Sequence, residues 1–138
     1  MSPDTAPCGG LPGDRLLEGH AVLVTGGASG LGLGMASAMA AHGAAVMLAC
    51  RRLETGEPAA ASLRDAGYDV TCIRCDVTSA EDLRAAVDAT IAAHGRLDCM
   101  VHNAIASTGG PTLIHEIARQ HWDAMVSTTI RATFEGAR

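Results

Sequence analysis

The chain of 138 residues contains no lysine, so all ten of its basic residues are arginines. It has only three aromatic residues, Tyr68, Trp122 and Phe134. The formal net charge is −5 and no basic run occurs, which excludes the usual surface for a nucleic-acid backbone. The length suits one domain with a core and is too short for two ordinary ones. Hydrophobic residues make up 48% and alanine dominates them, which favours close packing of helices on a sheet.

No apolar run reaches transmembrane length. Residues 1–17 also lack the charged start and apolar block of a signal peptide. These absences predict a cytoplasmic protein without a membrane partner. The segment Ser2–Gly13 contains three prolines and three glycines, so we expect residues 1–17 to form a flexible arm before a domain spanning residues 18–138.

The five cysteines do not form a metal-binding pattern. Cys72 and Cys75 have the CxxC spacing, but they lie in an apolar run typical of a strand, where residues three apart point to opposite faces. A second pair is missing. His115, Glu116 and His121 likewise match no compact helical ligand pair. We therefore predict no metal site and reduced, mostly buried thiols.

Strand and helix patterns alternate along the chain. Strands are expected at Ala21–Thr25, Ala45–Ala49, Val70–Cys75 and Leu97–His102, and helices at Leu31–His42, Leu53–Ala66 and from Thr78 to His94. Pro58 is unfavourable in a helix interior, which suggests that the second helix begins near Glu57. The alternation predicts a parallel sheet with right-handed crossovers, an α/β doubly wound fold.

Two of the expected helices end in the same letters, Ala-Ala-His-Gly. His42 and His94 would lie at the negative end of the helix dipole, and Gly43 and Gly95 would supply the left-handed cap. We interpret both histidines as helix-terminal residues rather than catalytic ones.

A glycine cluster, Thr25-Gly-Gly-Ala-Ser-Gly-Leu-Gly32, joins the first strand to the first helix. The literal G-x-G-x-x-G pattern is absent, and the glycines are spaced G-x-x-x-G-x-G. Glycines at such a junction permit a tight turn and let the backbone approach a pyrophosphate, while the first helical N–H groups face the anion. Taken alone, the cluster is equally compatible with a glycine turn that binds nothing.

The second strand ends in Arg51 and Arg52, and no acidic residue occurs between Gly32 and Glu54. In a dinucleotide fold an acid at this position favours the ribose 2′-hydroxyl of NAD, whereas an arginine accommodates the 2′-phosphate of NADP. The sequence therefore favours NADP(H) over NAD(H). Two solvated arginines at a strand end are the alternative interpretation.

Residues 16–138 resemble the N-terminal half of the classical short-chain dehydrogenase/reductase family. Thr25-Gly26-x-x-x-Gly30-x-Gly32 matches its cofactor motif, and Asp76, just after the third strand, matches an aspartate that binds the adenine amino group. A turn or cap role is the alternative for Asp76. The resemblance implies a Rossmann-like sheet of strand order 3-2-1-4 between two helical layers, incomplete on its C-terminal side. The implied cofactor-binding residues are Gly26, Ser29, Gly30, Leu31, Gly32, Arg51, Arg52, Asp76, Val77, Asn103 and Ala104.

The segment His102-Asn103-Ala104-Ile105 resembles the family's Asn-Asn-Ala-Gly motif, of which only Asn103 and Ala104 match. Ile105 places a branched side chain where glycine permits close approach. A structural role is favoured over a catalytic one for His102.

The segment His121–Phe134 resembles the family's next long helix, with Thr129 at the position of the active-site asparagine. A threonine hydroxyl does not reproduce the two donors of an amide. The family's chemistry rests on a serine, a tyrosine and a lysine, but Tyr68 is the only tyrosine here and lysine is absent. No catalytic residue is therefore assigned, and the end of the chain inside a helical pattern suggests a fragment.

The leading hypothesis is the cofactor-binding half of an NADP(H)-dependent oxidoreductase that transfers hydride between nicotinamide and a small-molecule carbonyl or secondary alcohol. A longer form would be a possible homo-oligomer. The alternative is a non-catalytic dinucleotide-binding module or an inactive fragment. A Rossmann-like methyltransferase using S-adenosylmethionine is a third hypothesis, which Thr25 at the strand end and the arginine pair disfavour.

Overall fold

The computed structural model describes residues 15–106 and 113–138. Its four strands are β1 (Ala21–Thr25), β2 (Ala45–Cys50), β3 (Val70–Arg74) and β4 (Cys99–His102). All three strand pairs are parallel, and the order in the sheet is β3-β2-β1-β4. The predicted strand order and parallel pairing are confirmed.

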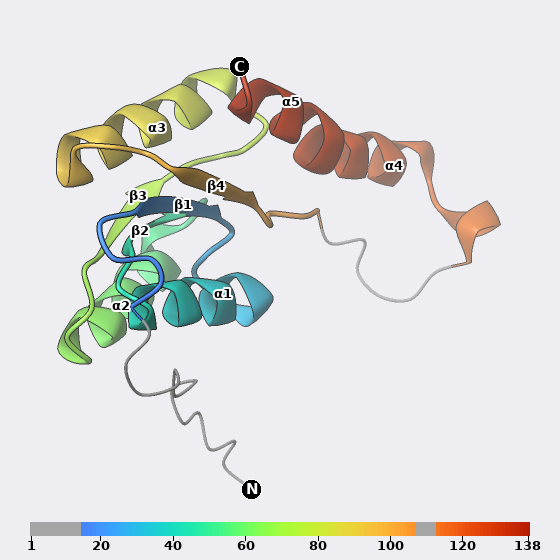
Figure 1. Ribbon diagram of the computed structural model, residues 1–138. Coiled ribbons are helices and arrows are strands. Elements are labelled where there is room, and N and C mark those ends of the chain that lie inside the picture. Colours follow the sequence, from blue (N-terminus) through green and yellow to red (C-terminus); the bar gives the residue numbers. More distant parts are fainter. Residues whose placement is uncertain (1–14, 107–112) are drawn as a thin grey trace, which may run out of the picture.

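The strands are joined by α1 (Gly30–Ala41), α2 (Leu53–Asp65) and α3 (Ala80–His94). After β4 come a 3₁₀ turn (Ile114–Glu116), α4 (Arg119–Val126), a π-helical turn (Ser127–Arg131) and α5 (Ala132–Gly136). Figure 1 shows α1 and α2 on one face of the sheet and α3 and α5 on the other. The expected three-layer α/β/α architecture is thereby confirmed.

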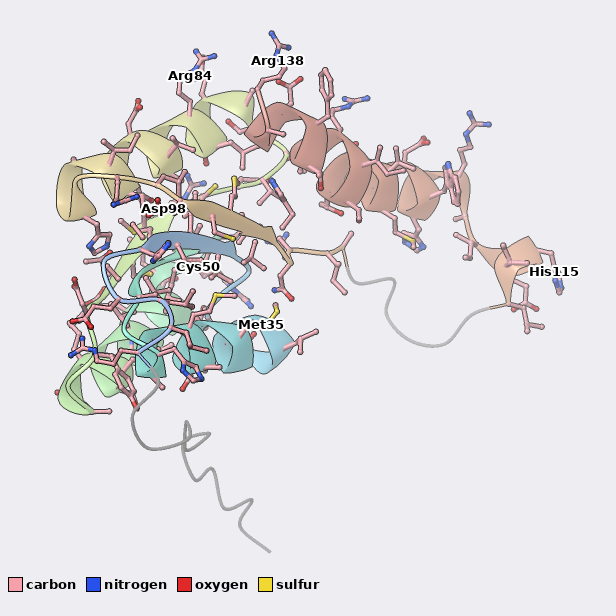
Figure 2. The ribbon with its side chains drawn as sticks, in the orientation of Figure 1. Met35, Cys50, Arg84, Asp98, His115 and Arg138 are labelled. Atoms are coloured by element: carbon pink, nitrogen blue, oxygen red, sulfur yellow. The ribbon has the colours of Figure 1, made fainter. Side chains whose placement is uncertain are left out.

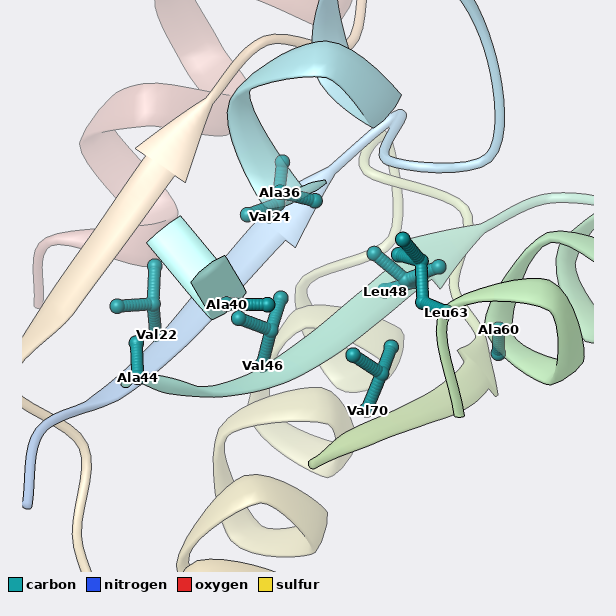
Figure 3. Packing of buried hydrophobic residues seen from close by; sticks show 10 residues of the cluster. All are labelled: Val22, Val24, Ala36, Ala40, Ala44, Val46, Leu48, Ala60, Leu63 and Val70. Carbon is teal, nitrogen blue, oxygen red and sulfur yellow. The ribbon is translucent and has the colours of Figure 1, made fainter. Parts of the chain in front are cut away.

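The core consists of two clusters, one on each face of the sheet. Val22 and Val24 of β1 point into the first cluster and Leu23 into the second, as the alternation of a strand requires. In the first cluster Ala36, Ala40 and Ala60 bring α1 and α2 close to the strands (Figure 3). Because both faces are covered, β1 and β2 are apolar along nearly their whole length.

Helix α2 begins at Leu53, so the suggested start near Glu57 is wrong. Pro58 is an interior residue of this helix. The helix tolerates the lost backbone hydrogen bond because Ala60 and Leu63 are buried against the sheet, and such packing outweighs intrinsic propensity. Before the proline, the Thr55 hydroxyl donates to the Arg52 carbonyl at 2.9 Å and supports the first turn.

The helix ends follow the predicted pattern. Gly43 and Gly95 have φ of 94° and 79°, the left-handed region that glycine adopts without strain. The His94 side chain is only 4% exposed, lies 3.6 Å from the Asp69 carboxylate and is 3.1 Å from the Thr71 hydroxyl. His94 therefore joins the end of α3 to β3, which agrees with a structural role.

Cys72 and Cys75 pack on opposite faces of the sheet, as the strand pattern predicted. Across residues 15–106 and 113–138 no group of three or more metal-ligating side chains gathers. Figure 2 shows His115 at the outer end of the C-terminal segment, far from the sheet. Nor does any helix in these ranges have the length and apolar character needed to span a bilayer.

Most of the expected flexible arm, residues 1–14, lies outside the described residues. Within the remainder of that range, the Leu17 amide donates to the His42 carbonyl at 2.9 Å. Leu17 also packs against the first core cluster. The chain is thus held against the end of α1 a few residues before β1 begins.

Candidate functional site

A pocket of about 680 Å³ opens at the carboxyl ends of the strands. It contains every predicted cofactor-binding residue except Gly30, which is the first residue of α1. The lining residues are Gly26, Ala28, Ser29, Leu31, Gly32, Ala49, Cys50, Arg51, Arg52, Thr55, Cys75, Asp76, Val77, Thr78, Asn103, Ala104, Ile105, Ala106, Ala124 and Thr128. In open parallel sheets this is the edge where ligands bind.

Thr25 and Asn103 join the carboxyl ends of β1 and β4. The Thr25 hydroxyl donates to the Val101 carbonyl at 3.2 Å and accepts from the amides of Asn103 and Ala104. In return, the Asn103 side-chain amide donates to the carbonyls of Thr25 and Gly26 at 3.1 and 3.2 Å. The Asn103 side chain thus holds the glycine loop in place. Asn103, which the sequence predicts to bind the cofactor, therefore also positions the loop that lines the pocket.

Two glycines of the loop are required by close packing. Gly26 has φ of 66°, and a β-carbon there would lie 3.0 Å from the Asn103 amide nitrogen. A β-carbon on Gly32 would overlap the Gly26 carbonyl oxygen and lie 2.5 Å from the same amide nitrogen. The loop and the start of α1 can therefore approach each other only with glycine at these positions.

The first turn of α1 faces the pocket through Ser29, Leu31 and Gly32. This turn contains no acidic residue, and the Ser29 side chain makes no capping hydrogen bond. The partial positive charge of the helix N-terminus is therefore not offset by a carboxylate of its own. Such an end favours an anionic group in the pocket.

Arg51 and Arg52 follow β2 and form the wall of the pocket beside the start of α2. Both are exposed, and within the described part of the chain neither forms an ion pair. Two guanidinium groups thus remain available for an anionic ligand. A phosphate suits their planar donor geometry.

Asp76 also lines the pocket, just after β3, which is the strand next to β2 in the sheet. Its Oδ1 accepts from the Thr78 amide at 2.9 Å and from the Thr78 hydroxyl at 2.7 Å. These hydrogen bonds lower the pKa of the Asp76 carboxyl below its ordinary value. The turn role weighed from the sequence is therefore present, and the carboxylate lines the pocket at the same time.

His102 lies against α5 and does not line the pocket. A β-carbon on Gly136 would come within 2.5 Å of the His102 ring, so glycine allows α5 to pack on the imidazole. Burial lowers the pKa of His102. Its neighbour Ile105, by contrast, is 73% exposed and lines the pocket.

The depressed pKa of His102 gives a pH-dependent stability. The unfolded chain binds a proton to this residue more readily than the folded chain, so stability should rise with pH through the range just below the ordinary histidine pKa of about 6.5. We expect the melting temperature to fall as the pH is lowered from 7 to 5. The His102→Asn variant, measured in the same buffers by circular dichroism, should show a smaller fall. An equal fall in both proteins would contradict this role of His102.

Thr129, which the sequence comparison placed at the asparagine position, is exposed and does not line the pocket. Thr128 lines it instead, accepting from the Ala106 amide at 3.1 Å and donating to the Ala124 carbonyl at 2.9 Å. The Thr133 hydroxyl donates to the Thr129 carbonyl at 2.7 Å. These bonds to helix carbonyls accompany the π-helical turn. The run of hydroxyl residues Ser127-Thr128-Thr129 is the sequence pattern that could have indicated this π-helical turn.

Comparisons with known proteins agree with this geometry. The family model for short chain dehydrogenase matches residues 20–138. (+)-Borneol dehydrogenase 1 of Salvia officinalis is 43% identical over 99 residues, which cover 72% of this chain and 36% of that protein. Tropinone reductase-like 1 of Erythroxylum coca is 36% identical over 126 residues, covering 90% of this chain and 45% of that protein.

A solved structure of a citronellol catabolism dehydrogenase from Pseudomonas aeruginosa PAO1 is 31% identical, with a TM-score of 0.79. The similarity covers 90% of this chain and 50% of that one. The chain thus spans about half the length, or less, of the relatives it matches. With the sheet order, the glycine loop and the family match in agreement, the chain belongs to the short-chain dehydrogenase family.

Proposed function

We propose that the pocket binds NADP(H) and that the chain is the cofactor-binding part of an oxidoreductase. The carrying observation is the pair Arg51 and Arg52, which lines the pocket and forms no ion pair with any carboxylate of the described residues. The substrate would be a small carbonyl compound or secondary alcohol. Relatives named borneol, cyclopentanol and threitol dehydrogenase support an alcohol or its carbonyl counterpart.

The residues present fit the two charged parts of this cofactor. The pyrophosphate would lie at the start of α1, where glycine backbone and uncompensated helix amides line the pocket. The 2′-phosphate would lie against Arg51 and Arg52, and Asp76 would face the adenine. When bound, the cofactor supplies the hydride chemistry at its nicotinamide ring. The chain's own residues bind and orient it.

The non-catalytic module remains the second candidate. It is favoured by the exposed Thr129, which stands where the family resemblance implies the active-site asparagine. We propose that the 138-residue chain alone does not turn over substrate. A cytoplasmic setting is proposed as well, because Cys50, Cys72, Cys75 and Cys99 are all free thiols.

Calorimetric titration of the 138-residue chain with NADPH, NADH and S-adenosylmethionine tests the cofactor proposal. We expect NADPH to bind at least about tenfold more tightly than NADH, the scale of one charge-assisted hydrogen bond. S-adenosylmethionine should not bind, because it has no phosphate to occupy the anion sites. Equal affinities for the two dinucleotides would contradict the NADP(H) preference, and binding of S-adenosylmethionine alone would replace the oxidoreductase proposal.

A further inference from the structure

Two thiols lie side by side at the end of the sheet that carries the arginine pair. The Sγ atoms of Cys50, the last residue of β2, and Cys72, in β3, are 3.6 Å apart. In the strand register Cys50 is opposite Arg74 and Cys72 is opposite Leu48, so the two cysteines are diagonal neighbours. Their side chains nevertheless converge on the α2 face of the sheet.

Helix α2 is shaped to leave room for this pair. Its residue above the thiols is Gly56, and a β-carbon there would overlap Cys50 Sγ and lie 2.6 Å from Cys72 Sγ. Glycine in a helix interior costs about 0.5–1 kcal/mol relative to alanine. Gly56 is buried, so its presence in α2 is explained by the space that the two sulfurs occupy.

Cys50 also connects the pair to the pocket. It lines the pocket wall although it is only 6% exposed, and its thiol is 3.3 Å from the Arg52 carbonyl. We propose that Cys50 and Cys72 form a reversible disulfide when a peroxide reaches Cys50 through the pocket. The part of this proposal that concerns the cofactor, namely that the disulfide weakens NADP(H) binding, rests on the function proposed above.

The reaction balances with hydrogen peroxide as the oxidant. The Cys50 sulfur, as thiolate, attacks one peroxide oxygen, the O–O bond breaks, and the leaving hydroxide takes up a proton to become water. The Cys72 sulfur then attacks the Cys50 sulfur, the S–O bond of the sulfenic acid breaks, and a second water leaves. Two thiols lose two electrons in total, and one peroxide is reduced to two waters.

Burial raises the pKa of Cys72 to about 12, so little thiolate exists there at neutral pH. The second step should therefore be slow near pH 7 and accelerate as the pH rises. Disulfide formation also requires the sulfurs to approach to about 2.05 Å from a diagonal arrangement. Cys50 ends its strand, so the movement would be taken up by the turn that carries Arg51 and Arg52.

Two other cysteines provide comparisons within the same chain. Cys75 lies one residue after β3 but packs in the core cluster on the opposite face of the sheet. Cys99 is exposed at the start of β4, the edge strand. Among the cysteines that the structure describes, neither of these two makes a hydrogen bond to another sulfur, so we expect neither to pair with a described cysteine.

Peptide mapping tests the disulfide directly. Because the chain has no lysine, trypsin separates its cysteines into different peptides, residues 1–15, 16–51, 65–74, 75–84 and 97–119. After dilute peroxide treatment of the folded chain and alkylation, we expect peptide 16–51 joined to peptide 65–74, with the bond lost on reduction. Peptides 16–51 and 65–74 recovered fully alkylated, or Cys50 joined to Cys75, would overturn the proposal.

The effect on the pocket is tested separately, by titrating oxidised and reduced chain with NADPH. We expect about tenfold weaker binding after oxidation, the loss of one charged hydrogen bond, with recovery on reduction. Cys72→Ser should abolish the change and Cys99→Ser should retain it. Unchanged affinity in a chain shown to carry the disulfide would overturn the regulatory part. If the reduced chain does not bind NADPH, the proposed function fails, and peptide mapping still decides the disulfide.

Discussion

Replacing Arg51 with alanine is expected to weaken NADPH binding by about 1.5–3 kcal/mol, or roughly 10–150-fold, and to leave NADH binding nearly unchanged. The two cofactors differ only in the 2′-phosphate, and Arg51 is an exposed residue of the pocket wall that forms no ion pair within residues 15–106 and 113–138. Its guanidinium can make two charge-assisted bonds to a phosphate. Isothermal titration of the variant with both cofactors measures the difference.

Arg84 supplies a matched control, because it is an exposed arginine on α3 that does not line the pocket (Figure 2). Arg84→Ala removes the same charge from the protein. Because a distant exposed charge is largely screened by salt, the affinities for NADPH and NADH should both stay nearly unchanged. Equal losses for NADPH and NADH in Arg51→Ala would assign Arg51 to a shared part of the cofactor and refute the 2′-phosphate contact.

Gly32→Ala should lower the free energy of unfolding by roughly 2–4 kcal/mol, a large part of the 5–15 kcal/mol typical of a domain. The added methyl group would overlap the Gly26 carbonyl oxygen and crowd the Asn103 amide, which donates to Thr25 and Gly26. Overpacking costs about 1–3 kcal/mol, and weakened hydrogen bonds add to this. Urea denaturation of the variant gives the value.

The control for this substitution lies two residues further along the same helix. A β-carbon on Gly34 would meet nothing within 4 Å, and the residue is exposed. Gly34→Ala should therefore stabilise α1 by about 0.5–1 kcal/mol through helix propensity alone. If both variants lost stability equally, close packing at Gly32 would not be the cause.

Periodicity was sufficient to predict the strands and their parallel pairing, because β1 and β2 are buried on both faces and their apolar runs are hard to mistake, whereas the strand order came from the family resemblance. The pocket followed from topology, since parallel strands deliver residues from Gly26 to Ala104 to one edge. Pro58 misled the prediction of α2 because local propensity takes no account of the contacts that Ala60 and Leu63 make with the sheet.

Two other features depend on contacts that no local pattern records. The proximity of Cys50 to Cys72 arises from the diagonal register of β2 and β3 together with the space left by Gly56. The pocket position of Thr128, in place of Thr129, depends on the π-helical turn, where one additional residue per turn changes which side chain faces the sheet edge. Register and helix phase are set by tertiary packing.

The hydrogen bonds between Thr25 and Asn103 connect residues 78 positions apart in the chain. During synthesis the glycine loop is therefore made well before Asn103, the residue that stabilises it, is added to the chain. Contacts of such long sequence separation form slowly, because a large loop must close first. A ligand that requires both walls of the pocket recognises only molecules in which β4 has already joined β1. It would therefore protect the finished fold by slowing its unfolding, without accelerating the folding that precedes it.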